Sequence, residues 1–470
     1  MSLPSNNKDQ NDNNNTATPQ DDYNLTTPLT TTTGLRQGLT SYGDAHFSLF
    51  LRKVFIKALG YNPCHANVPQ LIEATKRGVQ LAGGLAIDFP TITLHESFAY
   101  PTRTCGVMGT ASTMACLTAA LGMMPLKGAS APAVSSARLR IAEETGSNAV
   151  AVAIANRTPQ DILSEESFLN AITVLQAIGG STNAVVHLLA IANRHPAIKG
   201  KITLQTFDDI GRKTPLLIDL KPSGANYMTD FHNAGGKTLG EVLDESPFKS
   251  FAYSREVIRS LDNPLYPSSS LVVLRGNIAP NGAVMKASAS KDRSLLKHSG
   301  PAVVFEDTAD MARRIDDPDL PVTKDSVLVL KGIGPVGNPG MPEAGLIPLP
   351  RKLGAQGVTD MLRLSDGRMS GTAGGTIILH ISPESALPES PFGVVRTGDV
   401  ITCDVEQRRL HLEVLDEEIE RRVTERRKEI QRSVGEKESQ RGYRGLYIRS
   451  VNQAEEGADF DFLTASGANS

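Results

Sequence analysis

The sequence contains no tryptophan, and aromatic residues make up only 5% of its 470 residues. Stacking of sugars or nucleic-acid bases on exposed aromatic side chains is therefore not indicated. The net charge is −3, so no excess of positive charge favours nucleic acid or an anionic membrane. No apolar run approaches the length that spans a bilayer, which excludes a membrane-spanning helix. Four cysteines are too few for a disulfide framework and are better read as thiols or metal ligands.

What the sequence does contain is an ordinary globular composition, with 40% hydrophobic and 21% charged residues and enough length for two or three domains. Residues 1–33 are mostly Asn, Asp, Thr and Pro, and we expect a disordered tail. Import into mitochondria would use an Arg-rich, acid-poor presequence. This tail carries acidic residues and no Arg before Arg36. A cytoplasmic protein is therefore predicted, with a mitochondrial one as the alternative.

Helical periodicity dominates residues 34–255, which we assign to an N-terminal α/β domain. A Ser at 164 followed by Glu165 and Glu166 predicts the start of a helix that ends at Gly179. Residues 182–193 are apolar on all sides and predict a buried helix. Further helices are predicted over residues 47–59, 69–80, 113–121 and 135–144.

Short β-prone segments between Gly, Pro and Asp turns replace this pattern after about residue 255. They predict a mainly β, barrel-like domain over residues 256–470. The predicted strands are 271–274, 302–305, 326–330, 376–381, 394–405 and 410–414, and a charged helix is predicted over 417–434. The fold class is thus α/β, with an N-terminal α/β/α domain and a C-terminal barrel with flanking helices.

The stretch from Met361 to Ser382 is the strongest candidate for a site within the β-rich half. Glycines on both sides of Ser370 allow the backbone to approach a bound anion or metal closely. The β-branched run from Thr376 onward predicts a buried strand that holds this loop. A simple Gly-rich turn between two strands is the alternative.

Small residues and hydroxyls also open the apolar helix at residue 182. Ser181 and Thr182 lie at its N-terminus, where free N–H groups and the helix dipole favour an anion. Simple N-capping explains the same residues and is the reading that local sequence favours.

Cysteines and carboxylates in loops supply candidate metal ligands. Cys64 and Cys105 each precede a helix, where a thiolate is stabilised, whereas Cys116 lies within a helical stretch as a small core residue. Glu96 and Glu343 lie in loops of a kind that suits a hard cation such as magnesium. An exposed loop acid is the alternative for both. Residues 332–337 fit G-x-G-x-x-G, but the prolines that follow leave no helix for a dinucleotide loop to open.

Five ordered motifs together resemble the dihydroxy-acid and sugar-acid dehydratase family. They are CGVMGTASTM at 105–114, GGSTNAVVHLLAIA at 179–192, LRGNIAPNGAVMK at 274–286, GPVGNPGMPE at 334–343 and SDGRMSGT at 365–372. The resemblance runs from about residue 34 to the C-terminus. The cysteine segment and AEEGADFDFL at 454–463 are more similar to the aldonic-acid branch, such as arabinonate or xylonate dehydratases.

The resemblance implies dehydration of a 2,3-dihydroxy acid to a 2-keto acid by a homodimer that uses an iron–sulfur cluster, expected to be of the two-iron type, and a magnesium ion. It makes Cys64 and Cys105 cluster ligands, and Glu96 and Glu343 magnesium ligands. Ser370 is then the base that removes the C2 proton. Magnesium would stabilise the enolate-like state, and nearby cations would have to lower the pKa of the serine.

One part of the family pattern is missing from this sequence. Members carry a Gly-Cys-Asp-Lys-Thr motif before the segment that matches Cys105, and it supplies a third cluster cysteine and further magnesium ligands. Here residues 100–104 lead directly into Cys105. Shorter gaps occur near Pro63 and Lys237. We therefore expect a truncated gene product or splice form of a dehydratase, of poor solubility.

Three functions fit this pattern. The chain is a working hydro-lyase with an unrecognised third ligand, for which only Cys116 and Cys403 remain. It is a pseudo-enzyme or dimer partner without cluster and metal. Or it is a binder of sugar acids that keeps the anion contacts of Ser181, Thr182, Ser370 and Thr372. A dihydroxy-acid dehydratase of branched-chain amino-acid synthesis is an alternative to the sugar-acid enzyme.

Overall fold

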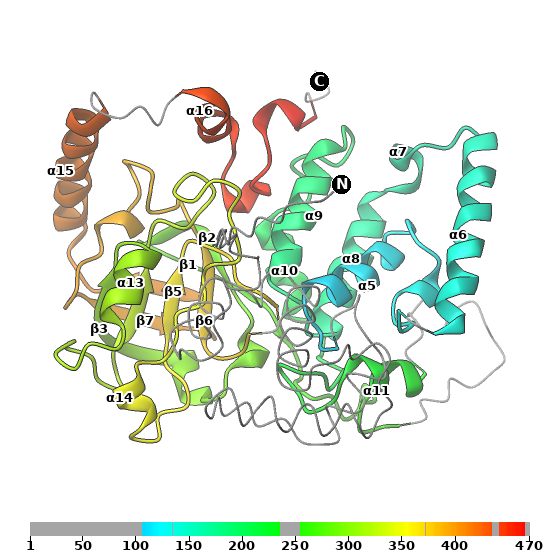
Figure 1. Cartoon of the computed structure of the whole chain (residues 1–470), viewed down its shortest axis with the longest axis horizontal. Coiled ribbons are helices and arrows are strands. Elements are labelled where there is room, and N and C mark those ends of the chain that lie inside the picture. Colours follow the sequence, from blue (N-terminus) through cyan, green and yellow to red (C-terminus); the bar gives the residue numbers. More distant parts are fainter. Residues whose placement is uncertain (1–105, 134, 236–253, 372, 435–440, 466–470) are drawn as a thin grey trace, which may run out of the picture. The chain divides into compact units, whose positions relative to one another are not determined.

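The computed structural model describes residues 106–133, 135–235, 254–371, 373–434 and 441–465 (Figure 1). The chain forms two units, Met1–Ala99 and Tyr100–Ser470, and all the described residues belong to the second. The predicted tail, the helices over 47–59 and 69–80 and the candidates Cys64, Glu96 and Cys105 lie outside the described residues.

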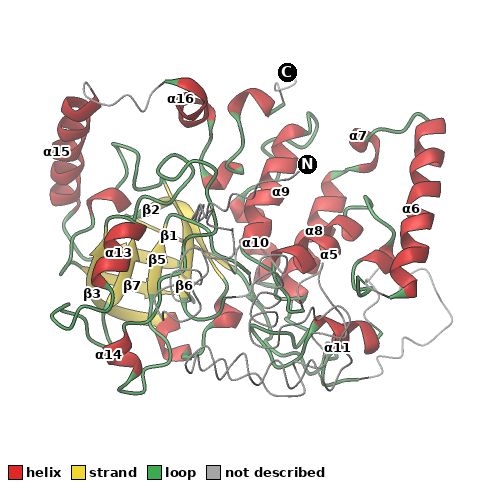
Figure 2. Cartoon of the chain, in the orientation of Figure 1, coloured by secondary structure: helices red, strands yellow, loops and turns green. Residues whose placement is uncertain are grey.

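A closed barrel forms the centre of the C-terminal half, and its strands are drawn in yellow in Figure 2. Its strands follow the order β1-β2-β6-β5-β4-β3-β7-β8. They are β1 (Val272–Gly276), β2 (Ala279–Met285), β3 (Lys297–Phe305), β4 (Val327–Leu330), β5 (Arg363–Ser365), β6 (Ile377–Ser382), β7 (Val400–Asp404) and β8 (Arg409–Leu412).

Four adjacent strands, β3, β4, β5 and β6, run parallel to one another. Parallel strands are usually covered on both faces, and every residue of β4 is buried. Val327 and Val329 point into the barrel core, while Leu328 and Leu330 pack outward in a second cluster. That cluster includes Met311 from α13 (Thr308–Arg314). β3 and β4 together with α13, called here the α13 wall, therefore bury hydrophobic residues on both faces, and the residues that directly follow these strands are counted with this wall.

Helices occupy the described part of the N-terminal half. They are α5 (Thr110–Ala120), α6 (Ser136–Ile154), α7 (Pro159–Ile162), α8 (Glu165–Ala177), α9 (Asn183–Arg194), α10 (Leu204–Gly211) and α11 (Met228–Asn233). The predicted capping of α8 is confirmed, since the Ser164 side chain accepts a hydrogen bond from the backbone N–H of Ser167. The remaining α-helices are α14 (Arg351–Gly354), α15 (Asp416–Val434) and α16 (Gly442–Ser450).

The barrel and these helices share one hydrophobic cluster. Val273 of β1 and Val284 of β2 pack in it with Leu117 of α5 and Leu188 of α9. The outer face of β1, β2 and β6 is called here the helix wall. A nearly buried ion pair of 2.6 Å between Arg408 and Asp208 of α10 spans the same junction.

The structure confirms the predicted barrel but adds two strands. β2 was missed because Pro280, Asn281 and Gly282 have the composition of a turn, although the residues after them are buried. β5 was missed because Arg363 is charged. In the fold this guanidinium is buried and paired with Asp360 at 2.8 Å. The α/β/α layout of the N-terminal domain stays a prediction. Within the described ranges no helix is long and apolar enough to span a bilayer.

Candidate active site

The loop that carries Ser370 joins β5 to β6 and is fixed at both ends by buried carboxylates. On the β5 side, Asp366 accepts hydrogen bonds from the backbone N–H groups of Ile333 at 3.2 Å and Ser385 at 2.8 Å. Complete burial raises the pKa of Asp366 above its usual range, although these bonds oppose the shift. The start of the loop is therefore held to two other segments of the barrel.

The far end of the loop is anchored by Asp360. Its carboxylate accepts hydrogen bonds from the N–H and, at 2.8 Å, the hydroxyl of Thr376, and it pairs with Arg363. Burial alone raises the pKa of Asp360, but the bonds from Thr376 and the charge of Arg363 outweigh it and lower the pKa. Ser370, which is half-buried, thus lies on a loop with two rigid ends.

Gly371 brings this loop against the N-terminal ends of two helices. A Cβ atom on Gly371 would lie 2.8 Å from the side-chain oxygen of Ser181 and 2.9 Å from the backbone nitrogen of Thr110. Only a glycine allows so close an approach. The predicted requirement for glycine next to Ser370 is therefore met by contact with α5 and the residues before α9.

One hydroxyl before α9 bonds the backbone at the start of the helix. The backbone N–H of Asn183, the first residue of α9, donates to the Ser181 side chain at 3.2 Å, although Ser181 precedes the N-cap position. Thr182 occupies the N-cap position, is 6% exposed and makes no side-chain capping bond. The Ser181 hydroxyl also lies 3.0 Å from the hydroxyl of Thr110.

Glu343 completes this corner from the Gly- and Pro-rich loop. Its Oε1 atom accepts hydrogen bonds from the Asn183 side-chain amide and, at 3.4 Å, from the Thr110 hydroxyl. The same amide nitrogen of Asn183 donates to the carbonyl of Met369 at 3.0 Å and to Thr110 at 2.9 Å. Asn183 therefore links the carboxylate, the helix end and the residue before Ser370.

Burial raises the pKa of Glu343, while Arg368 and the two hydrogen bonds act against the shift. Arg368 lies in the Ser370 loop, and its Nε donates to the carbonyl of Met341. Desolvation and the same guanidinium lower the pKa of His187 on α9 and hold that of His380 on β6 at about 3. At neutral pH both imidazoles are therefore uncharged.

The predicted site residues divide into two groups. The structure brings Ser181, Glu343 and the loop of Ser370 together, with Thr182 buried beside them. Thr372, Cys64, Glu96 and Cys105 lie outside the described residues. Their assignment as substrate, cluster and magnesium ligands stays a prediction.

The two described cysteines are core residues. Cys116 on α5 is 3% exposed and Cys403 on β7 is fully buried, and both thiols are free. Burial raises the pKa of each to about 12, which disfavours the thiolate that a metal needs. The prediction for Cys116 is confirmed. The described ranges also contain no group of three His, Cys, Asp or Glu side chains that could hold a metal ion.

Sequence reasoning missed two residues of this corner, Thr110 and Asn183. Each lies in a motif that carries the family resemblance: Thr110 lies within residues 105–114, and Asn183 directly follows the Ser181–Thr182 pair. Their bonds to Glu343 span 233 and 160 positions, so no local pattern could reveal them.

Comparison with known families gives this geometry a context. Residues 95–245 match the family described as "Dihydroxy-acid/6-phosphogluconate dehydratase N-terminal", and residues 256–458 match the corresponding C-terminal family. The chain belongs to the dihydroxy-acid/6-phosphogluconate dehydratase family. The site described above is contributed by both matched regions, since Asn183 lies in the first and Glu343 in the second.

Curated relatives in this dehydratase family have several substrates in their names. A 6-deoxy-6-sulfo-D-gluconate dehydratase of Pseudomonas putida is 42% identical over 385 residues, covering 78% of this chain and 65% of the relative. An L-arabonate dehydratase of Azospirillum brasilense is 43% identical over 376 residues, covering 75% of this chain and 63% of the relative. A dihydroxy-acid dehydratase of Caldicellulosiruptor saccharolyticus is 36% identical over 402 residues, covering 80% of this chain and 69% of the relative. The chain thus spans about two thirds of these relatives.

Proposed function

We propose that this protein is a hydro-lyase that removes water from a 2,3-dihydroxy acid to give a 2-keto acid. The observation that supports this most is the contact of Gly371 with Ser181 and Thr110, because it places the Ser370 loop at a corner that also holds Glu343. A hydroxyl on a fixed loop suits proton removal from a polyhydroxy acid when its neighbouring residue, here Met369, is linked through Asn183 to a partly buried carboxylate.

In this reaction Ser370 acts as an alkoxide and accepts the proton from C2 of the acid. The electron pair of the C–H bond forms a C2–C3 double bond as the C3–O bond breaks. The departing hydroxide takes the proton from Ser370 and is released as water, which returns Ser370 to its starting state. The resulting enol then tautomerises to the 2-keto acid. Thr110, Asn183 and Ser181 offer the hydrogen-bonding groups that would orient the hydroxyls of the substrate.

The resemblance adds an iron–sulfur cluster held by Cys64 and Cys105 and a magnesium ion held by Glu96 and Glu343. When bound, these groups would supply Lewis-acid chemistry. Of the four residues, only Glu343 is described, and the described ranges contain no set of three metal-ligating side chains. The described residues by themselves therefore do not fit either group, and no step above is assigned to them.

An aldonic sugar acid is the proposed substrate class, because relatives at 42% and 43% identity are named for sugar acids. The dihydroxy acid of branched-chain amino-acid synthesis is the second candidate, supported by the relative at 36% identity. A homodimer in the cytoplasm is part of the proposal, on the resemblance and the composition alone.

The direct test is formation of keto acid from L-arabinonate, xylonate, galactonate and 2,3-dihydroxyisovalerate by the purified full chain. Iron and acid-labile sulfide are measured on the same sample. Keto acid from at least one acid supports the proposal. A folded protein that carries stoichiometric cluster and magnesium but converts none of the acids overturns it.

An inactive member of the family is the second candidate function. It is favoured by the two described thiols, since both are buried in the core and neither can replace the missing third cysteine. A folded sample without iron or sulfide, even after anaerobic reconstitution, would support this alternative.

A further inference from the structure

The helix wall contains a buried lysine that the proposed reaction has not used. Lys286 follows β2 directly and is 8% exposed. Its Nζ atom has no hydrogen-bond partner within the described parts of the chain. An ammonium group buried without a partner is costly, and such groups in native proteins call for an explanation.

Strand alternation places this side chain on the outside of the barrel. Met285 points into the barrel core, so the residues on either side of it point outward. Val284, the outward neighbour on one side, packs against α5 and α9. Lys286 lies on the same side, facing the helices.

The neighbours of Lys286 belong to the candidate site. Val284 and Met285 pair with Leu379 and Ile378 of β6. Lys286 directly follows the last of these pairs, next to the start of β6 at Ile377. Ile377 and Leu379 pack outward against Met369, the residue before Ser370. The outer face of this strand pair therefore lies beneath the Ser370 loop.

The residues that follow Lys286 reach both sides of the same site. The carbonyl of Ala289 accepts a hydrogen bond of 2.9 Å from Gly375, at the end of the Ser370 loop. The Ser288 hydroxyl lies 3.0 Å from the Ser270 hydroxyl. The Ser270 hydroxyl in turn lies close to Gly179, since a Cβ atom built on Gly179 would be 3.3 Å from it. Lys286 is thus bracketed by the loop of Ser370 and the turn that leads into α9.

We propose that Lys286 binds the carboxylate of the acid substrate, between the N-terminus of α9 and the Ser370 loop. This inference rests on the proposed function. The 12-residue helix α9 has no acidic residue in its first turn, so its dipole favours an anion at the same place. The unpartnered, buried ammonium is the independent observation that points to a ligand.

The pKa of Lys286 supports this role. Burial lowers it to about 7, so the amine is only partly protonated at neutral pH. The titratable and charged side chains on the elements next to this segment in the chain or in the sheet are His187, Lys221, Lys291, Asp292, Arg293, Glu343, Asp360, Arg363, Arg368 and His380. None of them contributes to the shift, whose only cause is burial. An anion bound to Lys286 raises its pKa again, and binding above neutral pH therefore takes up a proton.

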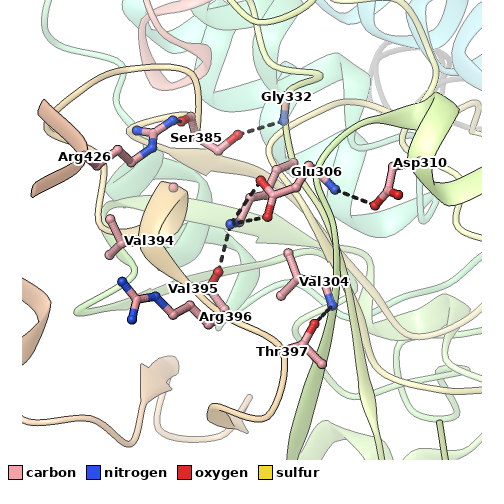
Figure 3. Close-up of polar contacts among 12 residues, drawn as sticks. Val304, Glu306, Asp310, Gly332, Ser385, Val394, Val395, Arg396, Thr397 and Arg426 are labelled. Atoms are coloured by element: carbon pink, nitrogen blue, oxygen red, sulfur yellow. Dashed lines mark hydrogen bonds and ion pairs between the residues drawn. The ribbon is translucent and has the colours of Figure 1, made fainter. Parts of the chain in front are cut away.

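A second buried lysine offers a matched control on the α13 wall. Lys331 is 5% exposed, but its ammonium donates to Glu306 at 3.1 Å and to the carbonyl of Val395 at 2.8 Å (contacts of Glu306 and Val395 in Figure 3). Replacing it removes a buried positive charge that makes no hydrogen bond to the residues around Glu343, although this charge also acts on Asp366 at the start of the Ser370 loop.

The test is calorimetric binding of sodium L-arabinonate and of the uncharged L-arabinitol to the full chain, at pH about 8. Two buffers of different ionisation enthalpy report the proton uptake. We expect the wild-type protein to prefer arabinonate by about tenfold or more and to take up close to one proton. Lys286→Met should lose both the preference and the uptake. Lys286→Arg should keep the preference without the uptake, and Lys331→Met should keep both.

Thermal melts establish whether each variant is folded. If Lys286→Met does not fold, Lys286→Arg still tests the inference. Unchanged arabinonate binding in folded Lys286→Met, or no binding of either arabinonate or 2,3-dihydroxyisovalerate by the wild-type protein, overturns the inference. Wild-type protein that binds acid through Lys286 but forms no keto acid leaves the inference intact and overturns only the proposed reaction.

Discussion

The two walls of the barrel differ in whether their buried polar groups have hydrogen-bond partners. On the α13 wall, the ammonium of Lys331 is fully engaged by Glu306 and the carbonyl of Val395. On the helix wall, the Nζ of Lys286 and both ring nitrogens of His380 have no partner in the described ranges. Both walls bury their hydrophobic residues equally well.

The difference separates structure from function within one barrel. A buried group that is fully paired stabilises a single fold, whereas an unpaired one costs stability in the free protein. A protein keeps such a destabilising group where a bound ligand supplies the missing hydrogen-bond partner. Substitutions on the helix wall should therefore change binding or turnover as well as stability, whereas those on the α13 wall should change stability alone.

The largest effect is expected for Ser370→Ala. If Ser370 removes the C2 proton, keto-acid formation should fall by roughly 10²–10⁴-fold, while the melting temperature stays within a few degrees of the wild-type value. Ser299→Ala is the control, since this exposed hydroxyl on β3 only contacts Thr402 at 3.0 Å. Equal activity of the Ser370 variant and the wild-type protein would show that another group removes the proton.

Lys286→Met should stabilise the protein, which is the reverse of the usual effect of a core substitution. Burial lowers the pKa of this lysine to about 7 in the folded protein, from 10.5 for a lysine in water. The penalty is thus fully present below pH 7 and disappears as the pH rises to about 10.5. We expect a gain in unfolding free energy on the order of 4 kcal/mol at pH about 6.

Urea denaturation at several pH values measures this gain, which should shrink by up to about 1.4 kcal/mol per pH unit above pH 7. A Lys286→Met protein that is less stable than the wild type at pH about 6 would mean that the ammonium has a stabilising partner. The contrast between the two walls would then be lost.

The sequence predicts those helices and strands that are determined by neighbouring residues, and it misses those that depend on contacts between distant ones. The helix after Ser164 and the strand β4 are set by neighbouring residues, and both predictions are confirmed. β5 was missed because a buried Arg363 is possible only with Asp360 three positions earlier, a pairing that depends on the fold. The tertiary contact with Asp360 allows a charged residue in a buried strand, which the polarity of residues 363–365 alone does not predict.

The candidate site shows the same limit more strongly. Ser370, Ser181 and Glu343 were found because they lie in Gly-rich motifs or at a helix start. Lys286 was part of a quoted motif but was not singled out, because a lysine after a strand normally points into solvent. Only the burial of Val284 beside it and the pairing with β6 show that this lysine faces the helices.

Asn183→Ala tests whether the corner depends on its central link. The substitution removes the donor to Glu343, Thr110 and the Met369 carbonyl. We expect kcat/KM for the acid to fall by about 10–100-fold, as for other residues that orient a ligating or reacting group. Unfolding free energy should fall by about 1–3 kcal/mol.

A matched control lies on the same helix. Asn193 is half-buried near the other end of α9, where its side chain donates to the carbonyl of Glu456 at 2.9 Å and accepts from the backbone N–H of Gly200 at 3.4 Å. Asn193→Ala should leave kcat/KM within about twofold of the wild-type value, because a surface hydrogen bond is worth little. Equal losses in the two variants would indicate a general effect on α9 and no special role for Asn183.

The smallest effect should come from Lys331→Met on the α13 wall. The variant leaves the Val395 carbonyl without its donor, but Glu306 is exposed and can be hydrated by solvent. The unfolding free energy should therefore fall by only about 1–2 kcal/mol in urea denaturation, with acid binding unchanged. Lys297→Met, which removes an exposed ammonium that lies 3.4 Å from the buried Asp404, should cost less than about 1 kcal/mol. If Lys331→Met weakened acid binding as much as Lys286→Met, buried charge anywhere in the barrel would matter to the site. The distinction between the two walls would then fail.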